Sequence, residues 1–323
     1  TLIMQSRKGS IQMNKRLIII GNGFDLDHGL NTYYSGFRKY LLNNKYRDNY
    51  AIIPSPVYDH HGEEHFDEDE LKNFLFQEIQ GDGDDEWSDF EERLGYLDFE
   101  ENLVSLPELG NADGNEWHDV DDNEDNMHNA FLAFSHLTDL FIEWLNSIVD
   151  DYKDDYKYNK NVNSIKTKSK FAKLLTGNTE ILIFNYTNTV EDLYDFYGVN
   201  HIHGTLSNED IVLGHSQIID TEERFLGADD IIADIEQSLR KNTNSIIKNN
   251  TDFFEGLCDI DEVYTYGFSF SSVDMPYIIE IIKNIPRKAK WFLHKSKYEV
   301  TNEKAYTQKL KSNDFVGAIK EWL

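Results

Sequence analysis

The sequence predicts an α/β fold, with a mainly parallel Rossmann-like sheet and helices on both of its faces. Three observations lead to this prediction. The run LIII at residues 17–20 is apolar, β-branched and followed by glycine, which is typical of a buried parallel strand. Further strand patterns recur after residue 179 with helical segments between them. A long acidic stretch separates the first strand from the others.

The first half of the chain is predicted to hold one strand and an insertion. After LIII, the segment TYYSGFRKYLLNN has aromatic residues and leucine at helical spacing. Residues 46–150 are rich in Asp and Glu, and we expect a mostly helical insertion there. Its last part, 127–150, is apolar enough to predict a long helix packed against the sheet. We therefore expect one α/β domain over 13–323, preceded at 1–12 by an extension or a cloning remnant.

The second half is predicted to complete the sheet. Five strand patterns are present: EILIFNYT (180–187), VNHIHG (199–204), DIVLGH (210–215), DEVYTYGFS (261–269) and AKWFLH (289–294). Helical patterns, notably over 229–253 and 275–284, lie between them. This alternation is typical of a parallel sheet with both faces covered.

Composition narrows the functional classes. The chain has 323 residues, with 31 basic and 59 acidic side chains and a formal net charge of −28. Such a charge repels phosphate backbones, so direct binding of nucleic acid is not expected. The single cysteine, Cys258, excludes an intrachain disulfide and a four-cysteine zinc site, which favours a reducing cytoplasm. No apolar run approaches the roughly 20 residues that span a bilayer, so no membrane partner is expected.

The turn after the first strand, Gly21-Asn22-Gly23, has two interpretations. Glycines let a backbone approach a ligand such as a phosphate, but Leu26 stands where the GxGxxG fingerprint needs its third glycine. The alternative is a purely structural turn from strand to helix. Asp25 likewise is either a helix N-cap or an acceptor for a ribose hydroxyl.

Polar residues also follow the later strands. Asn185 ends one strand, and His203 with Gly204 ends another. A third strand ends at Gly267, and Ser269 and Asp274 come just after it. The carboxyl ends of parallel strands meet at one edge of the sheet, which is where open α/β sheets bind ligands. We therefore expect these residues and the Gly21–Asp25 turn to form one binding site.

In these segments the chain resembles the AbiH family of bacteriophage abortive-infection proteins. The resemblance covers most of residues 16–323 and rests on LIIIGNGFDLDHGLNTYYSGFRKYL, EWSDFEERL, FNYTNTVEDLY, HIHG and YGFSFSSVDMPYI in this order. It implies a cytoplasmic phage-defence factor, with a phage trigger or a partner protein to be expected.

A more distant resemblance is to the sirtuin-like NAD-binding fold, in which a GAG-type turn, an N-x-D motif, an HG motif and a late G-x-S follow in this order. It implies that GNG binds nucleotide, that Asn185 and His203 are catalytic, and that Gly267 and Ser269 form a nucleotide-binding turn. Thr187 stands where the sirtuin motif has Asp, and the cysteines of a sirtuin zinc ribbon are missing, which argues against a protein deacylase.

The chemistry of the two polar residues suits cleavage of the nicotinamide–ribose bond. A histidine that titrates near neutrality can act as general base, and an asparagine can orient water or ribose without adding charge. His201, two residues from His203 on the same strand, is an alternative base. His203 is preferred because Gly204 after it would leave room for a ligand, although a buried structural histidine remains the other interpretation.

Two functional hypotheses follow. The first is an enzyme that hydrolyses NAD or a related nucleotide upon infection, and the second is a non-catalytic nucleotide sensor that regulates a toxic effector. A nuclease is less favoured because no spaced carboxylate motif stands out. DHHGEEH, with His60, His61 and His65, is read as a solvated loop, so no metal site is predicted. In WSDFEERL, Trp87, Phe90 and Leu94 are expected in a core, while Asp89 and Glu92 are open to either a pocket or solvent.

Overall fold

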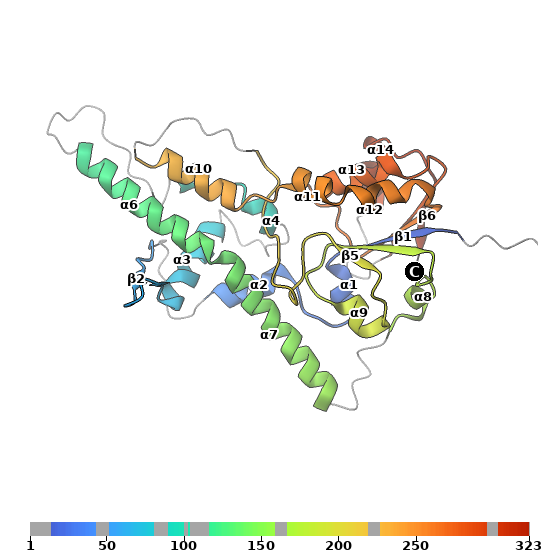
Figure 1. The fold of residues 1–323 in the computed structure, drawn as a ribbon, viewed down its shortest axis with the longest axis horizontal. Coiled ribbons are helices and arrows are strands. Elements are labelled where there is room, and N and C mark those ends of the chain that lie inside the picture. The colour runs from blue at the N-terminus through green and yellow to red at the C-terminus, as the bar shows by residue number, and fades with distance from the viewer. Residues whose placement is uncertain are drawn as a thin grey trace, which may run out of the picture.

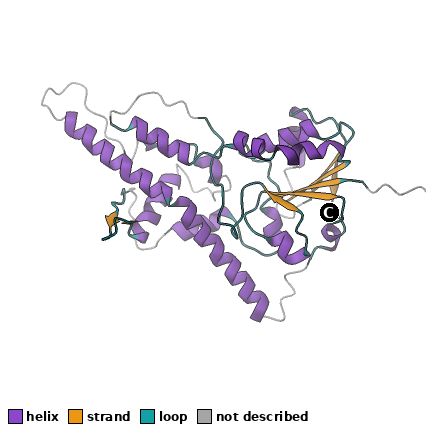
Figure 2. Cartoon of the chain, viewed as in Figure 1, coloured by secondary structure: helices purple, strands orange, loops and turns teal. Residues whose placement is uncertain are grey.

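The computed structural model describes residues 14–42, 52–80, 90–99, 103, 116–158, 167–218, 227–295 and 303–322. A six-stranded sheet lies at one end of the molecule, and helices cover both of its faces (Figure 2). Its strands are β1 (Arg16–Ile20), β4 (Thr179–Ile183), β5 (Val199–His201), β6 (Glu262–Tyr266), β7 (Lys290–His294) and β8 (Ile319–Trp322). Every neighbouring pair in this sheet is parallel. The predicted α/β fold class is confirmed.

The strand order identifies where a ligand can bind. The strands lie in the order β5-β4-β1-β6-β7-β8, so that numbering these six along the chain gives 3-2-1-4-5-6. This is the order of doubly wound nucleotide-binding sheets, in which the connections change direction between the first and fourth strands. Here that switch point lies between β1 and β6. Ligands of such sheets bind in the crevice outside the carboxyl ends of these strands.

The pattern of β1 explains how both faces become buried. Leu17 and Ile19 point to one face, while Ile18 and Ile20 point to the other, and none of the four is exposed to solvent. The first face packs against α11 (Thr243–Asn249), α12 (Thr251–Glu255), the 3₁₀ turn Gly256–Asp259, α13 (Met275–Asn284) and α14 (Glu303–Ser312). The second packs against α1 (Gly23–Asp27), α8 (Ser169–Ala172) and α9 (Thr189–Tyr194). A strand buried on both faces must be apolar throughout, as LIII is.

A second hydrophobic core consists of helices and lies beside the sheet (Figure 1). It contains α2 (Tyr34–Leu41), α3 (Glu68–Gln80), α4 (Phe90–Arg93), α6 (Glu116–Ser135), α7 (Leu137–Tyr158) and α10 (Asp229–Ser238). The described part of the acidic insertion is mostly helical, apart from a hairpin of β2 (Val57–Tyr58) and β3 (Glu64–His65). Because α2 and α10 belong to this core, the helical layer is larger than the segment 46–150.

Two sequence predictions about the elements are wrong. The long helix predicted over 127–150 is two helices, α6 and α7, separated at His136, and it packs in the helical core instead of on the sheet. The segment DIVLGH (210–215) forms no strand, because Ile211 and Leu213 pack against the helical core and only His215 makes an isolated bridge, to Arg240. Within the described residues, no helix is both long and apolar enough to cross a membrane.

Candidate functional site

A cavity of about 380 Å³ opens at the carboxyl ends of the strands, where the sheet meets the helical core. Its wall contains turns after β1, β4 and β6, together with side chains of α4 and α7 from the insertion. Of the ten residues predicted for the site, nine line this cavity: Gly21, Asn22, Gly23, Asp25, Asn185, His203, Gly267, Ser269 and Asp274. The insertion is therefore part of the cavity wall, an outcome that the sequence left open at Glu92.

Gly204 is the predicted residue that does not line the cavity. It has φ of +77°, and a Cβ atom there would lie 2.1 Å from the carbonyl oxygen of Asp210. The space beside Gly204 is thus filled by the backbone of the following loop. The expectation that this glycine leaves room for a ligand is wrong, because it makes room for Asp210 instead.

The two glycine turns pack directly against each other at the switch point. The amide of Gly23 donates to the carbonyl of Gly267 over 2.9 Å. A Cβ atom on Gly21 would lie 2.6 Å from that same oxygen, and one on Gly267 would lie 2.3 Å from the carbonyl carbon of Gly23. Gly267 also has φ of +61°. Glycine is required here by contact between two turns.

Three amides of the first turn, which could otherwise bind a phosphate, are bonded within the protein. Gly21 donates to Tyr266 over 3.0 Å, and both Gly23 and Phe24 donate over 2.9 Å, to Gly267 and Gly21 respectively. These three backbone donors are therefore satisfied within the protein. Asn22 instead joins the turn to the next loop, since its side chain donates to the carbonyl of Thr32 and accepts from the hydroxyl of Thr32.

Asp25 is a buried acid in the wall of the cavity. Its Oδ2 atom accepts a hydrogen bond of 2.6 Å from the hydroxyl of Thr187, and its Oδ1 atom has no partner. Burial raises the pKa of Asp25 to about 6, although hydrogen bonds such as that from Thr187 oppose the shift. Asp25 lies inside α1, whose N-cap residue is Asn22, so the N-cap interpretation is wrong.

Asn185 is held beside Asp25 at the end of β4. Its side chain is buried and lowers the pKa of the Asp25 carboxyl, while neither the Nδ2 nor the Oδ1 atom makes a hydrogen bond of normal geometry. The alternative base, His201, is committed to other contacts: Nε2 lies 2.8 Å from the carboxylate of Glu191, and Nδ1 lies 3.3 Å from the carbonyl of Asn185. His201 does not line the cavity, whereas Asn185 does.

His203 lies deep in the wall, between a lysine and an acid. Its Nδ1 atom is 3.4 Å from the ammonium of Lys241, and its Nε2 atom is 3.9 Å from Asp274 Oδ1 and has no hydrogen-bond partner. Burial and the Lys241 charge hold the pKa of His203 well below its usual range, so the imidazole is neutral. Burial raises the pKa of Asp274 to about 6, against the opposing effect of Lys241.

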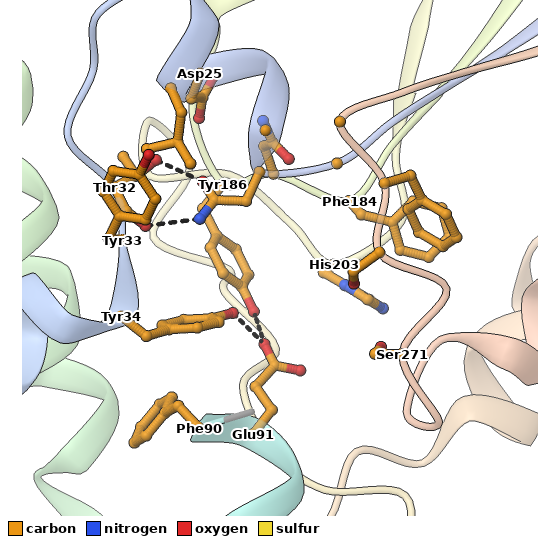
Figure 3. A pocket seen from close by; sticks show the side chains of 18 of the residues that line it. Asp25, Thr32, Tyr33, Tyr34, Phe90, Glu91, Phe184, Tyr186, His203 and Ser271 are labelled. Atoms are coloured by element: carbon orange, nitrogen blue, oxygen red, sulfur yellow. Dashed lines mark hydrogen bonds between the residues drawn. The ribbon is translucent and has the colours of Figure 1, made fainter. Parts of the chain in front are cut away.

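Glu91 connects the helical core to Lys241, which lies beside His203 (Figure 3). One carboxylate oxygen accepts from the hydroxyls of Tyr34 and Tyr186, over 3.0 and 2.7 Å. The other accepts from Lys241 over 2.6 Å, and the Lys241 side chain is completely buried. All four residues come from different parts of the chain, so this ion pair fixes the insertion against the loops that follow β4 and α10.

Comparison with known proteins gives one family. Residues 17–295 match the family model described as "Bacteriophage abortive infection AbiH". The chain belongs to the AbiH family. Its role is therefore in the abortive infection of bacteriophage-infected cells, as the resemblance of the motifs predicted. No curated protein and no solved structure matches the chain.

Several lining residues of this AbiH-family protein were not predicted. Glu91 is the main one, and its buried partner Lys241, which lies behind the wall, was not predicted either. The motif EWSDFEERL was the signal available for Glu91, because its apolar residues leave the acids to another face. Phe90 and Leu94 are buried as expected, and Glu92 does line the cavity. Trp87 and Asp89 lie outside the described residues. Nothing in the sequence around Lys241 indicated that it would be buried.

The histidine-rich hairpin lies in the helical part, on β2 and β3. Asp59, Glu63 and His65 offer ligand atoms within 4.8 Å of one another, and Glu63 and His65 are exposed. The Asp59 carboxylate accepts hydrogen bonds from the amides of His61 and Glu63, so it already stabilises the turn of the hairpin. The rings of His60 and His61 pack on each other, 3.9 Å apart. These contacts account for the hairpin as a local structure.

Proposed function

We propose that this AbiH-family protein defends against phage by binding NAD or a related nucleotide in the cavity and hydrolysing its glycosidic bond. The main support is the position of the cavity at the switch point of a sheet with the 3-2-1-4-5-6 order. Four polar side chains in its wall have buried atoms without hydrogen-bond partners: Asp25, Asn185, His203 and Asp274. Such atoms in native proteins call for a ligand, water or a catalytic role.

Hydrolysis would use these groups in the following way. Water attacks the anomeric carbon of the ribose, the carbon–nitrogen bond breaks, and the pyridinium ring leaves as neutral nicotinamide with the bonding electrons. The proton of the water passes to a base, for which His203 is the proposed residue, and Asn185 orients the water or the ribose. The products are ADP-ribose, nicotinamide and a proton.

Thr187 stands where the sirtuin motif has Asp, but the carboxylate of Asp25 lies next to it in the structure. The Thr187 hydroxyl donates to Asp25, so a carboxylate is present at the end of β4 although it comes from α1. Asp25 is placed to accept a hydrogen bond from a ribose hydroxyl through its unpartnered Oδ1 atom. We include this contact in the proposal.

The direct test is incubation of the purified protein with NAD, with and without extract of phage-infected cells, while nicotinamide and ADP-ribose are measured by chromatography. The expected result is release of the two products in equal amounts. Binding of NAD without release under either condition would contradict hydrolysis.

One observation favours the second candidate, a nucleotide sensor that cleaves nothing. Only 2% of His203 is exposed, and its two ring nitrogens face Lys241 and Asp274. A base must reach its proton within hydrogen-bond distance, directly or through one water. Under the sensor hypothesis, NAD binding would be measurable by calorimetry and would change the affinity for a partner protein. A cytoplasmic location remains a prediction for either candidate.

A further inference from the structure

The charges and rings in the cavity wall indicate which ligand part the cavity recognises, given the proposed nucleotide-binding role. Four carboxylates line it, those of Asp25, Glu91, Glu92 and Asp274, and among the described lining residues none is Lys or Arg. Lys241 neutralises Glu91 through their ion pair, but Lys241 itself is not a lining residue. His203, the single histidine among the described lining residues, is neutral. The wall therefore carries net negative charge.

Two of these carboxylates have capacity left for a ligand. Asp25 Oδ1 and Asp274 Oδ1 are buried and have no hydrogen-bond partner, while their second oxygens accept from Thr187 and Ser271. A buried ionised carboxylate without a full set of partners is costly, and a cation relieves that cost. An anionic group at the same place would add to it.

Aromatic side chains form much of the remaining wall. Tyr33, Tyr34, Phe90 and Tyr186 lie on one side, and Phe184 lies on the other side near His203 (Figure 3). Phe141, Trp144 and Phe268 also line the cavity. Aromatic rings attract cations to their faces, because the ring quadrupole is negative there, and the attraction is stronger where water is excluded. Rings also stack on flat heterocycles.

The glycine turn adds a third observation. The amides of Gly21, Gly23 and Phe24 are bonded within the protein, so these three donors of the turn are not free to bind a phosphate. A negatively charged pyrophosphate thus gains little inside the cavity. The part of a nucleotide that fits best is a flat ring that carries a positive charge.

We propose that the cavity is a binding site for a cationic N-substituted heteroaromatic ring, and that it selects the pyridinium end of an oxidised nicotinamide nucleotide over uncharged rings and over phosphate groups. This proposal rests on the proposed nucleotide-binding role. The site proposal goes beyond the proposed function, because it names the chemical group that the cavity recognises and requires no bond cleavage.

The test compares two small probes of nearly equal shape. N1-methylnicotinamide is a permanent cation, and nicotinamide is neutral. Neither has a glycosidic bond, so binding is measured by calorimetry without turnover. At about pH 8, where both carboxylates are ionised, the cation is expected to bind about tenfold tighter or more than the neutral ring. Equal affinities, tighter binding of the neutral ring, or no binding of either probe at millimolar concentration would overturn the proposal.

A pH titration of the wild-type protein gives a second readout that needs no variant. The preference for the cation should fall as pH decreases through about 6, where Asp25 and Asp274 take up protons. Charged or hydrogen-bonding neighbours face both carboxylates: Thr187, Thr189, Asn185 and His201 around Asp25, and Lys241, Glu91, His203, Ser271 and Tyr277 around Asp274. A preference that stays constant from pH 8 to about 5 would contradict the assignment.

The matched variants are Asp274→Asn and Asp252→Asn. Asp274 is the N-cap residue of α13 but makes no side-chain capping bond, so the amide is expected to fold. Asp252 lies exposed in the first turn of α12 and does not line the cavity. Asp274→Asn should lower the affinity for the cation by about tenfold and leave that for nicotinamide unchanged, whereas Asp252→Asn should change neither. A protein that binds the cation but releases no nicotinamide from NAD would refute hydrolysis and support this site.

Discussion

Thr187 Oγ1 donates a hydrogen bond of 2.6 Å to Asp25 Oδ2 and so joins the end of β4 to the helix that follows β1. The two residues are 162 positions apart in the chain. Thr187 also shares a hydrogen bond with Thr189, the first residue of α9. The Oδ2 atom of the buried carboxylate thus accepts its hydrogen bond from a hydroxyl, and no Lys or Arg is among the described groups that act on Asp25.

The first prediction concerns the cost of that buried charge. The pKa of Asp25 is raised by burial to about 6, so the folded state binds a proton more tightly than the unfolded chain. Stability due to this group is therefore greatest at low pH and falls as pH rises from about 4 to 6. Asp25→Asn keeps an acceptor for Thr187 and removes the charge. It should raise the free energy of unfolding by about 2–3 kcal/mol at pH 8.

Urea denaturation at about pH 8 and about pH 4.5 would check this prediction. The gain should shrink at the lower pH because Asp25 is then already protonated in the folded protein. An Asp25→Asn protein that is no more stable than wild type at pH 8 would show that the carboxylate has partners beyond those described.

The second prediction concerns the ion pair of Glu91 and Lys241. Lys241 has no exposed side-chain surface, and only 12% of the Glu91 side chain is exposed. Lys241→Met should lower the free energy of unfolding by about 3–5 kcal/mol, because it leaves the Glu91 carboxylate buried without its cation. The double variant Glu91→Gln/Lys241→Met should recover part of this loss. A double-mutant cycle from urea unfolding curves measures the coupling. If the two single effects simply add, the pair is not coupled as the structure requires.

Sequence patterns predicted the sheet better than they predicted its surroundings. LIII and EILIF have the continuous apolar pattern of strands buried on both faces, and both are central strands. The edge strand β8 was missed, because its sequence IKEW alternates with charged residues and is only half-buried. DIVLGH has the short apolar run of a buried strand, but its residues Ile211 and Leu213 pack against the helical core. Periodicity shows that a residue is buried and does not show against which element.

Sequence patterns have the same limit at the candidate site, because they do not show which distant residues pack together. Asn185, His203 and Asp274 were found because strand ends in a parallel sheet share one edge. Glu91 and Lys241 could not be found in this way. One belongs to the insertion and the other to a loop after α10, and only the packing of two cores brings them within 2.6 Å. The glycines were identified correctly as turn residues, but glycine is required at these positions because the turns after β1 and β6 pack against each other.

The third prediction follows from that contact. In Gly21→Ala the new methyl group would lie 2.6 Å from the carbonyl oxygen of Gly267 and 2.7 Å from the Cα atom of Phe268, and both are backbone atoms. The turns must separate, so the variant should lose about 1–3 kcal/mol of stability. Gly256→Ala is the matched control, because a Cβ atom there meets nothing within 4 Å. Its expected change is within about 0.5 kcal/mol. Thermal melts of the two variants side by side would decide, and equal melting temperatures would contradict the close packing of the turns.

The last prediction separates the two functional candidates at the level of side chains. The amide of Asn185 makes no hydrogen bond of normal geometry, although it helps to lower the pKa of the neighbouring Asp25 carboxyl, so Asn185→Ala should leave the fold stable. His203 contacts the rings of Phe184 and Tyr277, so His203→Gln, which keeps most of its volume, is the better variant there than His203→Ala. If the protein hydrolyses NAD, each substitution should lower kcat by about 10²–10⁴-fold, while NAD binding measured by calorimetry changes much less. Thermal melts are the control, since unfolding would imitate inactivation. If His203→Gln, and His203→Ala where it folds, retain full nicotinamide release and full phage defence, the histidine is structural and the base must be another group, for which Asp274 is the nearest carboxylate in the cavity wall, 3.9 Å away.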